Sequence, residues 1–522
     1  MNNKTLEKFV LDLPGYYTLN EQQKGNVSKL LEVSKKFLQR AKIPDGVKNS
    51  ISSNTIILES GHQPNFFPHA GTWKKAFLLY RIQTALNQNG NDAVAFFGFA
   101  DQNISTARVL TKNRIPAMNK DGLIKIGFKI DEADKFKSFC SVDKPTPENW
   151  EKEITRIQHH YSDYAKKTRS NGVFLQKQWD HILELLWNSY EMATNSAELN
   201  AYIFARLCHE LFEINLNYFL YSDMYQDNLF FDESQKILRN LSPFNQSYNS
   251  VIREKGLDIP QVNLNHLPFW YNCDCGMKID LEVDDSFTSV AQCPLCHKEY
   301  DLAFGDDFNS LSRYYKNMDF TAVSRNVIMA HGLGDTLFIS GTGGSLQYGR
   351  ISDQISRDLG FHRPLTLGWR SGDYYLGMAH RAALHELMKQ FSLTEADLFT
   401  PALHQNIART LHQISHSIHE AESANNQKDR KYWSGLEGHA KNVAVFAQKI
   451  FSVTPSFLDI LANQDADSIL QAWTGALSLA EVKDEHGIFL MNRDITYHPH
   501  LLSDIPPDNL PVLYKNIRNI EV

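Results

Sequence analysis

The sequence predicts an α/β fold in which a parallel, Rossmann-like sheet is split into two halves. Near the N-terminal end, a short apolar run, an amphipathic helix and a second apolar run follow one another, at residues 55–58, 72–89 and 93–97. The same order returns more than two hundred residues later, at 336–339, 346–359 and 364–370. A strand–helix–strand order is typical of parallel pairing, because a parallel crossover needs a long connection.

The first half of the predicted sheet begins with Thr55–Leu58, a β-branched and apolar run typical of a buried strand. The turn-prone segment 60–65 follows it. Apolar residues then recur at helical spacing over 72–89, and Gly90 provides a cap. The run Ala93–Phe97 predicts a second buried strand, paired in parallel with the first.

The second half repeats this pattern, with a strand at 336–339, a helix that ends before Gly360 and a strand at Pro364–Arg370. A mostly helical region and a group of cysteines lie between the halves. We therefore divide the chain into an N-terminal helical lead-in (1–53), a first core half (54–145), a helical insert (146–262), a zinc ribbon (263–304), a second core half (305–375) and a helical C-terminal domain (376–522).

Composition excludes several classes of protein. The chain has 522 residues, 42% of them hydrophobic and 22% charged, which is ordinary for a globular protein of about three domains. No apolar run approaches the roughly 18 residues of a membrane helix. The first residues lack a basic start followed by an apolar stretch, so we expect a cytoplasmic protein without a membrane partner. The net charge of -7 argues against a large nucleic-acid surface.

Four of the six cysteines form the most specific motif in the chain. Cys273 and Cys275 precede Cys293 and Cys296, so that a C-x-C pair is followed by a C-x-x-C pair. Such spacing lets four thiolates reach one tetrahedral Zn²⁺, and a site closed by four protein ligands is structural rather than catalytic. The segment Lys278–Val290 predicts a hairpin between the two pairs. An iron–sulfur cluster is the main alternative.

Polar and glycine-rich segments follow three of the predicted strands. In open parallel sheets, ligands gather where the carboxyl ends of the strands meet. A glycine-rich turn that opens a helix can also present backbone N–H groups to a phosphate. The candidates are Gly61, His62 and Gln63 after the first strand, Asp101 after the second, and Ser340, Gly341, Gly343 and Gly344 after the third.

Each of these candidates, like the two lysines at the start of the first predicted helix, also has a structural interpretation. The glycines suit a tight strand-to-helix turn, and neither the Walker A nor the Rossmann spacing is present. His62 could be a packing residue and Asp101 a helix N-cap. Lys74 and Lys75, one turn into the first helix, could form a solvated face.

Two stretches together resemble the BshC family, the cysteine ligases of bacillithiol biosynthesis. The first is GHQPNFFPHAGTWKKAFLLYRI with AFFGFADQN, and the second runs from SRNVIMAHGLGDTLFISGTGG to RPLTLGWRS. They cover roughly residues 50–110 and 320–375. His62 stands where the family has its first Gln, Gly343-Gly344 where Gly-Glu is usual, and the cysteine group is not part of the family pattern. The opening HQPNFFP is also similar to the WbqC-like family.

The resemblance implies a core like that of class I aminoacyl-tRNA synthetases and a coiled-coil helical domain. It also implies a ligase that joins an amino acid, most simply cysteine, to the amine of a small acceptor such as an amino sugar conjugate. Amide formation from a free carboxylate is uphill, so ATP or another nucleotide is the expected cofactor beside zinc. A homodimer through the C-terminal helices is a further expectation.

Under this hypothesis the candidate residues take definite roles. His62 and Lys74 would stabilise developing charge. Asp101 would orient the amine or accept its proton. Arg370 would pair with a carboxylate or phosphate. The residues assigned to the nucleotide are Gly61, Gln63, Ser340, Gly341, Gly343, Gly344 and Gln347. The alternative hypothesis is a non-catalytic or RNA-associated synthetase-like protein that uses the zinc ribbon for docking.

Overall fold

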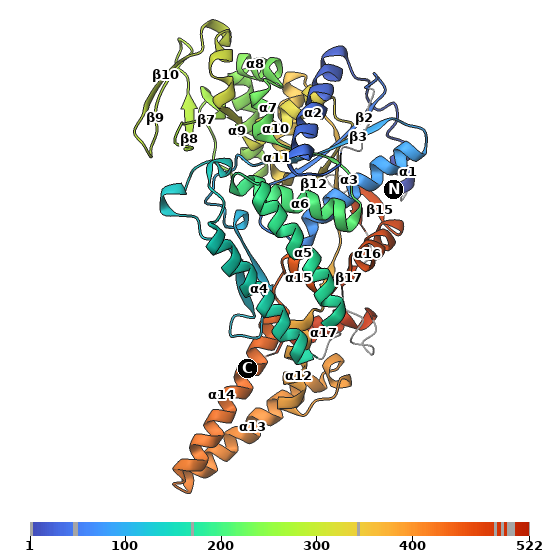
Figure 1. The fold of residues 1–522 in the computed structure, drawn as a ribbon, viewed down its shortest axis with the longest axis vertical. Coiled ribbons are helices and arrows are strands. Elements are labelled where there is room, and N and C mark those ends of the chain that lie inside the picture. The colour runs from blue at the N-terminus through green and yellow to red at the C-terminus, as the bar shows by residue number, and fades with distance from the viewer. Residues whose placement is uncertain are drawn as a thin grey trace.

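The centre of the protein is a sheet that joins distant parts of the chain (Figure 1). The computed structural model describes residues 4–44, 51–168, 172–341, 345–484, 488–491, 495–497 and 507–520. Within these residues, eight strands lie in the order β1-β15-β16-β13-β12-β2-β3-β6. They are β1 (Lys4–Thr5), β2 (Ile56–His62), β3 (Ala93–Phe99), β6 (Asn217–Leu220), β12 (Leu337–Ser340), β13 (Leu365–Arg370), β15 (Glu481–Asp484) and β16 (Ile488–Met491).

The predicted parallel sheet in two halves is confirmed. β2 and β3 are parallel, with Ile57 opposite Val94. β12 lies on the other side of β2, also parallel, with Leu337 opposite Leu58. Every neighbouring pair from β16 to β6 is parallel, whereas β15 is antiparallel to both β16 and β1. Helix α3 (Ala70–Gln88) connects β2 to β3, and α11 (Ser345–Leu359) connects β12 to β13.

The sheet extends beyond the predicted strands at both ends. β6 lies in the region predicted as a helical insert, and β1, β15 and β16 lie in the regions predicted to be helical at the two ends of the chain. β6 is only four residues long, all of them buried. Four buried residues show no alternation of apolar and polar positions, so sequence periodicity cannot separate such a strand from the helices around it.

Helices cover both faces of the sheet. Leu58 of β2 belongs to a hydrophobic cluster shared with α3 and with α6 (Ser196–Phe212). Ile57 points to the opposite face, as side chains alternate along a strand, and packs in a second cluster with α2 (Glu21–Arg40) and α10 (Ala322–Leu333). The remaining helices of the body are α1 (Leu6–Leu11), α4 (Pro147–Thr168), α5 (Gly172–Met192), α7 (Tyr221–Gln226), α8 (Phe231–Arg239), α9 (Leu241–Lys255), α12 (Met378–Phe391) and α17 (Leu510–Arg518).

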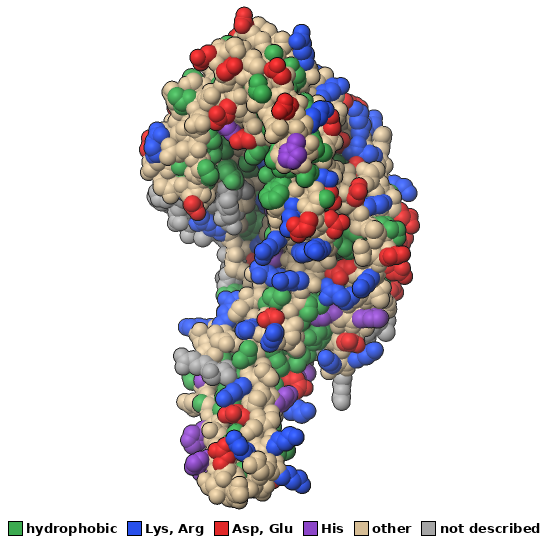
Figure 2. All heavy atoms as spheres, turned by 90° about the vertical axis from the view of Figure 1, so that its left-hand side faces the viewer, with side chains coloured by type: hydrophobic (Ala, Val, Ile, Leu, Met, Phe, Trp, Pro, Cys, Tyr) green, Lys and Arg blue, Asp and Glu red, His purple; other side chains and the backbone are tan. Residues whose placement is uncertain are grey.

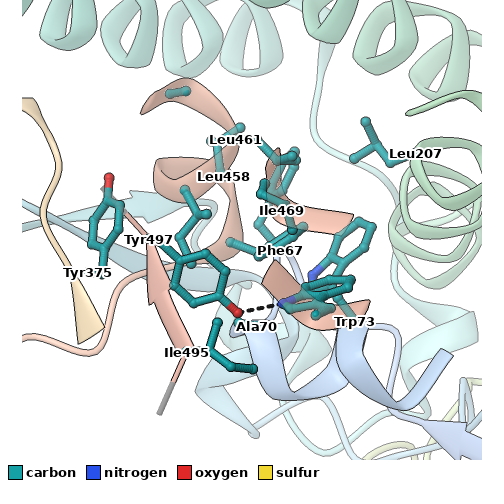
Figure 3. Close-up of a cluster of buried hydrophobic side chains, with 14 of the residues drawn as sticks. Phe67, Ala70, Trp73, Leu207, Tyr375, Leu458, Leu461, Ile469, Ile495 and Tyr497 are labelled. Carbon is teal, nitrogen blue, oxygen red and sulfur yellow. Dashed lines mark hydrogen bonds between the residues drawn. The ribbon is translucent and has the colours of Figure 1, made fainter. Parts of the chain in front are cut away.

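The C-terminal part forms an arm and then returns to the body. α13 (Ala402–Ser423) and α14 (Gln427–Ile450) make a long hairpin that projects from one end of the molecule (Figures 1 and 2). α15 (Phe457–Asn463), α16 (Ala466–Ser478) and β17 (Ile495–Tyr497), which pairs with β14 (Asp373–Tyr375), pack back against α3 (Figure 3). There Trp73 lies 4.7 Å from the ring of Phe457.

The four clustered cysteines lie in turns of small antiparallel sheets beside the body. β7 (His266–Asn272) pairs with β8 (Lys278–Glu282) and with β11 (Met318–Phe320), while β9 (Thr288–Gln292) pairs with β10 (Glu299–Ala303). A further hairpin, β4 (Lys112–Pro116) with β5 (Leu123–Gly127), follows β3. The predicted hairpin over Lys278–Val290 is therefore wrong. β8 and β9 are consecutive but belong to different sheets, because each pairs with a strand outside that segment.

In the part of the chain that the structure describes, no helix combines the length and the apolar character that crossing a bilayer would require.

We predict that Gly61→Ala destabilises the protein, because a Cβ at Gly61 would lie 2.7 Å from the backbone oxygen of Gly98 on β3. The backbone of two paired strands cannot move apart cheaply, and overpacking of this kind costs about 1–3 kcal/mol. Urea unfolding measures the loss. Gly25→Ala is the control: Gly25 is exposed on α2 with open space around it, so alanine should raise stability by up to about 1 kcal/mol. Equal stabilities of Gly61→Ala and the wild type would contradict the prediction.

Candidate functional site

The strand order reverses between β2 and β12. From β2 the chain proceeds outward through β3 to β6, whereas β12 and β13 occupy the other side of β2. At such a switch point the connections leave in opposite directions, and the carboxyl ends of the two central strands border a crevice that binds ligands in open α/β sheets. β2 ends at His62 and β12 at Ser340, and the register brings these ends together: Ile339 lies opposite Ser60.

His62 is a neutral, partly buried imidazole at this edge. Its Nδ1 lies 2.9 Å from the carbonyl oxygen of Gln63. Burial, with the charge of Lys75 adding to it, lowers the pKa of His62 to about 3. A neutral imidazole that donates from Nδ1 to a carbonyl carries its lone pair on Nε2. His62 can therefore accept a hydrogen bond through Nε2 at the end of β2, whereas its low pKa makes it a weak base.

Lys75 lies beside His62 and was not among the predicted site residues. Its Nζ donates to the carbonyl oxygen of Gly61 at 2.5 Å, and its side chain is buried. Burial lowers the pKa of Lys75 to about 7. A lysine that loses its proton near neutral pH can act as a base or nucleophile. Only the helical position next to Lys74 hinted at this residue in the sequence.

Lys74 joins α3 to the segment after β13. Its Nζ contacts Asp373 Oδ1 at 2.9 Å and Ser371 Oγ at 2.5 Å, and it lies 5.2 Å from the centre of the Trp369 ring. Tyr497 donates a hydrogen bond to the other oxygen of Asp373 at 3.3 Å, and accepts one from the indole N–H of Trp473 at 2.6 Å (Figure 3). The charge of Lys74 is thus balanced within the fold, and the interpretation of a solvated face is wrong for both lysines.

The carboxyl group of Asp101 is hydrogen-bonded to the first turn of α7. It is fully buried, and it accepts hydrogen bonds from the backbone N–H of Ser222 at 3.1 Å and from the Ser222 hydroxyl. Its carboxyl therefore caps the N-terminus of α7, as an N-cap aspartate does for its own helix. Burial raises the pKa of Asp101 to about 7. The cap that the sequence left open as an alternative is present, but on a helix more than a hundred residues further along the chain.

The other predicted residues divide between the edge and its surroundings. Arg370 is exposed at the end of β13, and Gln347 is exposed in the first turn of α11. Ser340 is buried and its hydroxyl lies 3.1 Å from the carbonyl oxygen of Gly341. Gln63 is partly buried after β2. Gly343 and Gly344 lie outside the described residues.

A pocket that the sequence did not predict lies on one face of the sheet. It has a volume of about 340 Å³ and lies between the strands β2, β12 and β13 and the helices α10 and α11. Two buried acidic residues, Glu59 and Asp335, line it together with Ser340 and Arg350. Glu59 interrupts the apolar run of β2, which was the one local signal of this pocket in the sequence.

The four cysteines form a candidate metal centre. The Sγ atoms of Cys273, Cys275, Cys293 and Cys296 all lie within 4.8 Å of one another. Cys273 and Cys296 are 3.4 Å apart, and Cys275 and Cys293 are 3.6 Å apart. Four thiolates about 2.3 Å from a tetrahedral zinc ion would be separated by similar distances. The arrangement can hold a metal ion such as zinc, and four protein sulfurs leave no position for substrate.

The local backbone supports this arrangement. Gly276 has φ +86°, a left-handed value that glycine adopts without strain, and its N–H donates to the carbonyl oxygen of Cys273 at 2.8 Å. The Tyr300 hydroxyl donates to Cys273 Sγ at 3.0 Å. Such outer contacts orient a metal ligand before the ion arrives.

Comparisons with known proteins add no family assignment. No protein-family model matches the chain, and the search of curated proteins finds no significant relative.

We predict that the purified protein carries one metal ion per chain at the four cysteines and that Cys293→Ser/Cys296→Ser removes it. Elemental analysis measures the content. The variant should also unfold the β7–β10 region, because metal binding to such a site contributes directly to its folding. Cys140→Ser is the control, since Cys140 is a free cysteine outside the cluster. Metal retained at full occupancy in the double variant would rule out the assignment.

We also predict that Lys75→Met changes the pH dependence of stability. With a pKa of about 7 in the folded protein, Lys75 binds fewer protons than the unfolded chain between about pH 7 and its ordinary pKa of about 10.4. Its contribution to stability therefore rises with pH in that window, by at most about 1.4 kcal/mol per pH unit. Methionine does not titrate, so its advantage over lysine should be largest below pH 7 and shrink above it. Urea unfolding between pH 6 and 9 tests this, and a difference independent of pH would contradict it.

Proposed function

We propose that the protein is an amide-forming ligase that joins an amino acid, cysteine in the first instance, to the amine of a small acceptor such as an amino sugar conjugate. The observation that carries the proposal is the switch point between β2 and β12, where partly buried polar groups meet at the carboxyl edge of a parallel sheet. The two stretches that resemble the BshC family supply these strand ends. The resemblance suggested the reaction, and the geometry is compatible with it.

The groups at the edge suit the two difficulties of amide formation. The carboxylate must be activated, and a nucleotide phosphate is the natural source of activation. The N-terminus of α11, the helix that follows β12, would bind such a phosphate, as helix N-termini do. The attacking amine must lose its proton, and a neutral Lys75, whose pKa is about 7, can accept it near pH 7. The neutral Nε2 of His62, whose pKa is about 3, would accept a hydrogen bond from the amine and position it.

We further propose that the metal at the cysteine cluster is zinc and that its role is structural. Four thiolate ligands saturate a tetrahedral zinc ion, so that it has no open position for substrate or water. The ion would hold the β7–β10 region in its folded form, and the reaction would take place at the sheet edge.

Incubation of the purified protein with L-cysteine, a small amine acceptor and ATP tests the proposal. We expect an amide product by mass spectrometry, with nucleotide consumed in equal amount. Structured RNA in place of the acceptor is the comparison. Tight RNA binding without any amide or nucleotide turnover would replace the ligase by the RNA-associated alternative.

We predict that His62→Ala lowers turnover about 100-fold, because losing a side chain that positions the attacking amine costs about 10²-fold. The melting temperature should stay close to that of the wild type, since the imidazole is only partly buried and its Nδ1 has one backbone partner. His416→Ala on the exposed arm is the control and should keep full activity. A fall in melting temperature large enough to explain the lost activity would show that His62 is a packing residue instead.

A further inference from the structure

The pocket beside the sheet has an acidic floor. Glu59 of β2 lies in one row with Phe338 of β12 and Thr366 of β13, because these residues are opposite one another in the parallel register. All three line the pocket, so this row forms its floor. Asp335 enters it from the turn between α10 and β12. α11 forms the opposite wall.

Asp335 is buried without a donor for its carboxyl group. Its side chain is fully buried, and among the described residues neither carboxylate oxygen accepts a hydrogen bond from an N–H group or a hydroxyl. The backbone of Asp335 is held on both sides: its N–H donates to the Ala330 oxygen at 3.3 Å, and its carbonyl accepts from His362 Nε2 at 2.6 Å. The side chain is therefore fixed at the pocket, and the carboxyl group of Glu59 is its polar neighbour there. A buried polar group without a partner is costly, and it indicates a missing ligand.

The carboxyl group of Glu59 lies within hydrogen-bonding reach of that of Asp335, so that the two can share a single proton. Glu59 is 3% exposed and also accepts a hydrogen bond from the Tyr221 hydroxyl at 3.1 Å. Burial raises the pKa of both carboxyl groups, and their mutual repulsion adds to the rise at Asp335. Arg325, 4.8 Å from the Tyr221 ring, opposes the rise at Glu59. The two carboxyl groups therefore have fewer hydrogen-bond donors around them than their oxygens can accept. A primary ammonium group would supply three such donors.

The opposite wall carries a positive charge. Arg350 of α11 lines the pocket, and within the described residues no carboxylate forms an ion pair with it. The other charges at the wall are paired: Asp353 contacts Arg363 at 2.8 Å and also pairs with Arg357. The pocket therefore presents an unpaired acidic floor and an arginine on another side.

We propose that this pocket binds a small zwitterion, with its primary ammonium on Asp335 and Glu59 and its carboxylate on Arg350. The inference deepens the proposed function and rests on it for the identity of the molecule, which is either the amino acid or the amine acceptor of the ligation. A volume of about 340 Å³ accommodates either of these small molecules.

Calorimetric titration of the full chain tests the two ends of the ligand separately. The probes are L-cysteine, cysteamine, which lacks the carboxylate, and 3-mercaptopropionate, which lacks the ammonium. All three carry the thiol, so contact with the metal centre is common to them. We expect L-cysteine to bind at least tenfold more tightly than either analogue. Muramic acid, an amino sugar that carries both an amine and a carboxylate, shows with and without L-cysteine whether the site takes the amino acid or the acceptor.

Substitutions assign each end to its residue. Asp335→Asn should weaken L-cysteine and cysteamine at least tenfold and leave 3-mercaptopropionate unchanged. Arg350→Gln should weaken L-cysteine and leave cysteamine unchanged. Glu59→Gln is the second variant for the ammonium, should Asp335→Asn not fold. Asp459→Asn is the matched control, because Asp459 is equally buried, with a pKa raised to about 7 by burial, but bonds to Tyr161 and Tyr375 away from the pocket.

The number of protons released when the ligand binds distinguishes ligand binding by Asp335 and Glu59 from a purely structural role of these residues. An ammonium that binds the acidic pair stabilises both carboxylates, so binding near pH 7 should release protons, measured in buffers of different ionisation heat. Ligand binding to the Asp335→Asn variant should release fewer protons than binding to the wild type. The charged and titratable groups around the pair are Tyr221 on α7, Arg325 on α10, Arg350 and Asp353 on α11, and His362 and Arg363 before β13.

Three results would overturn the inference: equal binding of L-cysteine and 3-mercaptopropionate, unchanged binding in both Asp335→Asn and Glu59→Gln, or Mg²⁺ bound at the pair in place of any amine. The proposed function fails separately. If L-cysteine binds as expected but no amide forms with ATP and an acceptor, the zwitterion pocket is supported and the ligase function is contradicted. If amide forms while Asp335→Asn keeps full affinity for the amine, the ligase function is supported and the zwitterion pocket is contradicted.

Discussion

The pairing of β2 with β12 is the interaction on which the rest of the structure depends. It joins two halves of a sheet that lie 279 residues apart at Ser60 and Ile339, where the Ser60 hydroxyl also donates to the Ile339 carbonyl at 2.9 Å. The parallel register, with Leu58 opposite Leu337, fixes which side chains meet on each face. A shift of one residue would turn Glu59 away from its pocket and bring Leu58 into it, since side chains alternate along a strand. The candidate edge and the pocket are thus two consequences of one register.

The same alternation separates two chemical environments on β2. Glu59 points to the face covered by α10 and α11, whereas Ser60 and His62 point to the face covered by α3. The first face collects buried carboxyl groups whose pKa values are raised, and the second collects Lys75 and His62, whose pKa values are lowered. In both cases burial disfavours the charged form. Lys75, whose pKa is about 7, can therefore exchange a proton with a bound molecule near pH 7, which an ordinary surface lysine does not do at that pH.

Sequence reasoning succeeded where the determining contacts are local. The strands at 56–58, 93–97 and 337–339 are apolar runs bounded by turns, and the cysteine cluster follows from the spacing of pairs within 24 residues of chain. Sequence reasoning failed where contacts with a segment distant in the sequence determine the environment of a residue. Glu59 and Asp335 meet only because β2 and β12 are neighbours, and no periodicity reports that contact. Asp101 caps α7, a helix that the chain reaches only after the three helices α4, α5 and α6 and the strand β6. Two adjacent lysines on a helix look like a solvated face, but both are buried: Lys74 pairs with Asp373 after β13, and Lys75 donates to the Gly61 carbonyl.

The cysteine cluster is connected to the sheet edge through one loop. The Ser138 N–H donates to the Gly276 carbonyl at 2.8 Å, and a Cβ at Gly276 would lie 2.7 Å from the side chain of Ser141. Two residues after Ser138, the N–H of Cys140 donates to the carbonyl of Asp101 at 2.9 Å. Lys278 adds a buried ion pair with Asp319 at 3.0 Å. The knuckle between Cys273 and Lys278 therefore packs on the loop that fixes the end of β3. A metal ion that orders this knuckle would stabilise the carboxyl edge without contacting substrate, because the order is passed on through backbone hydrogen bonds that exist only when the knuckle is folded.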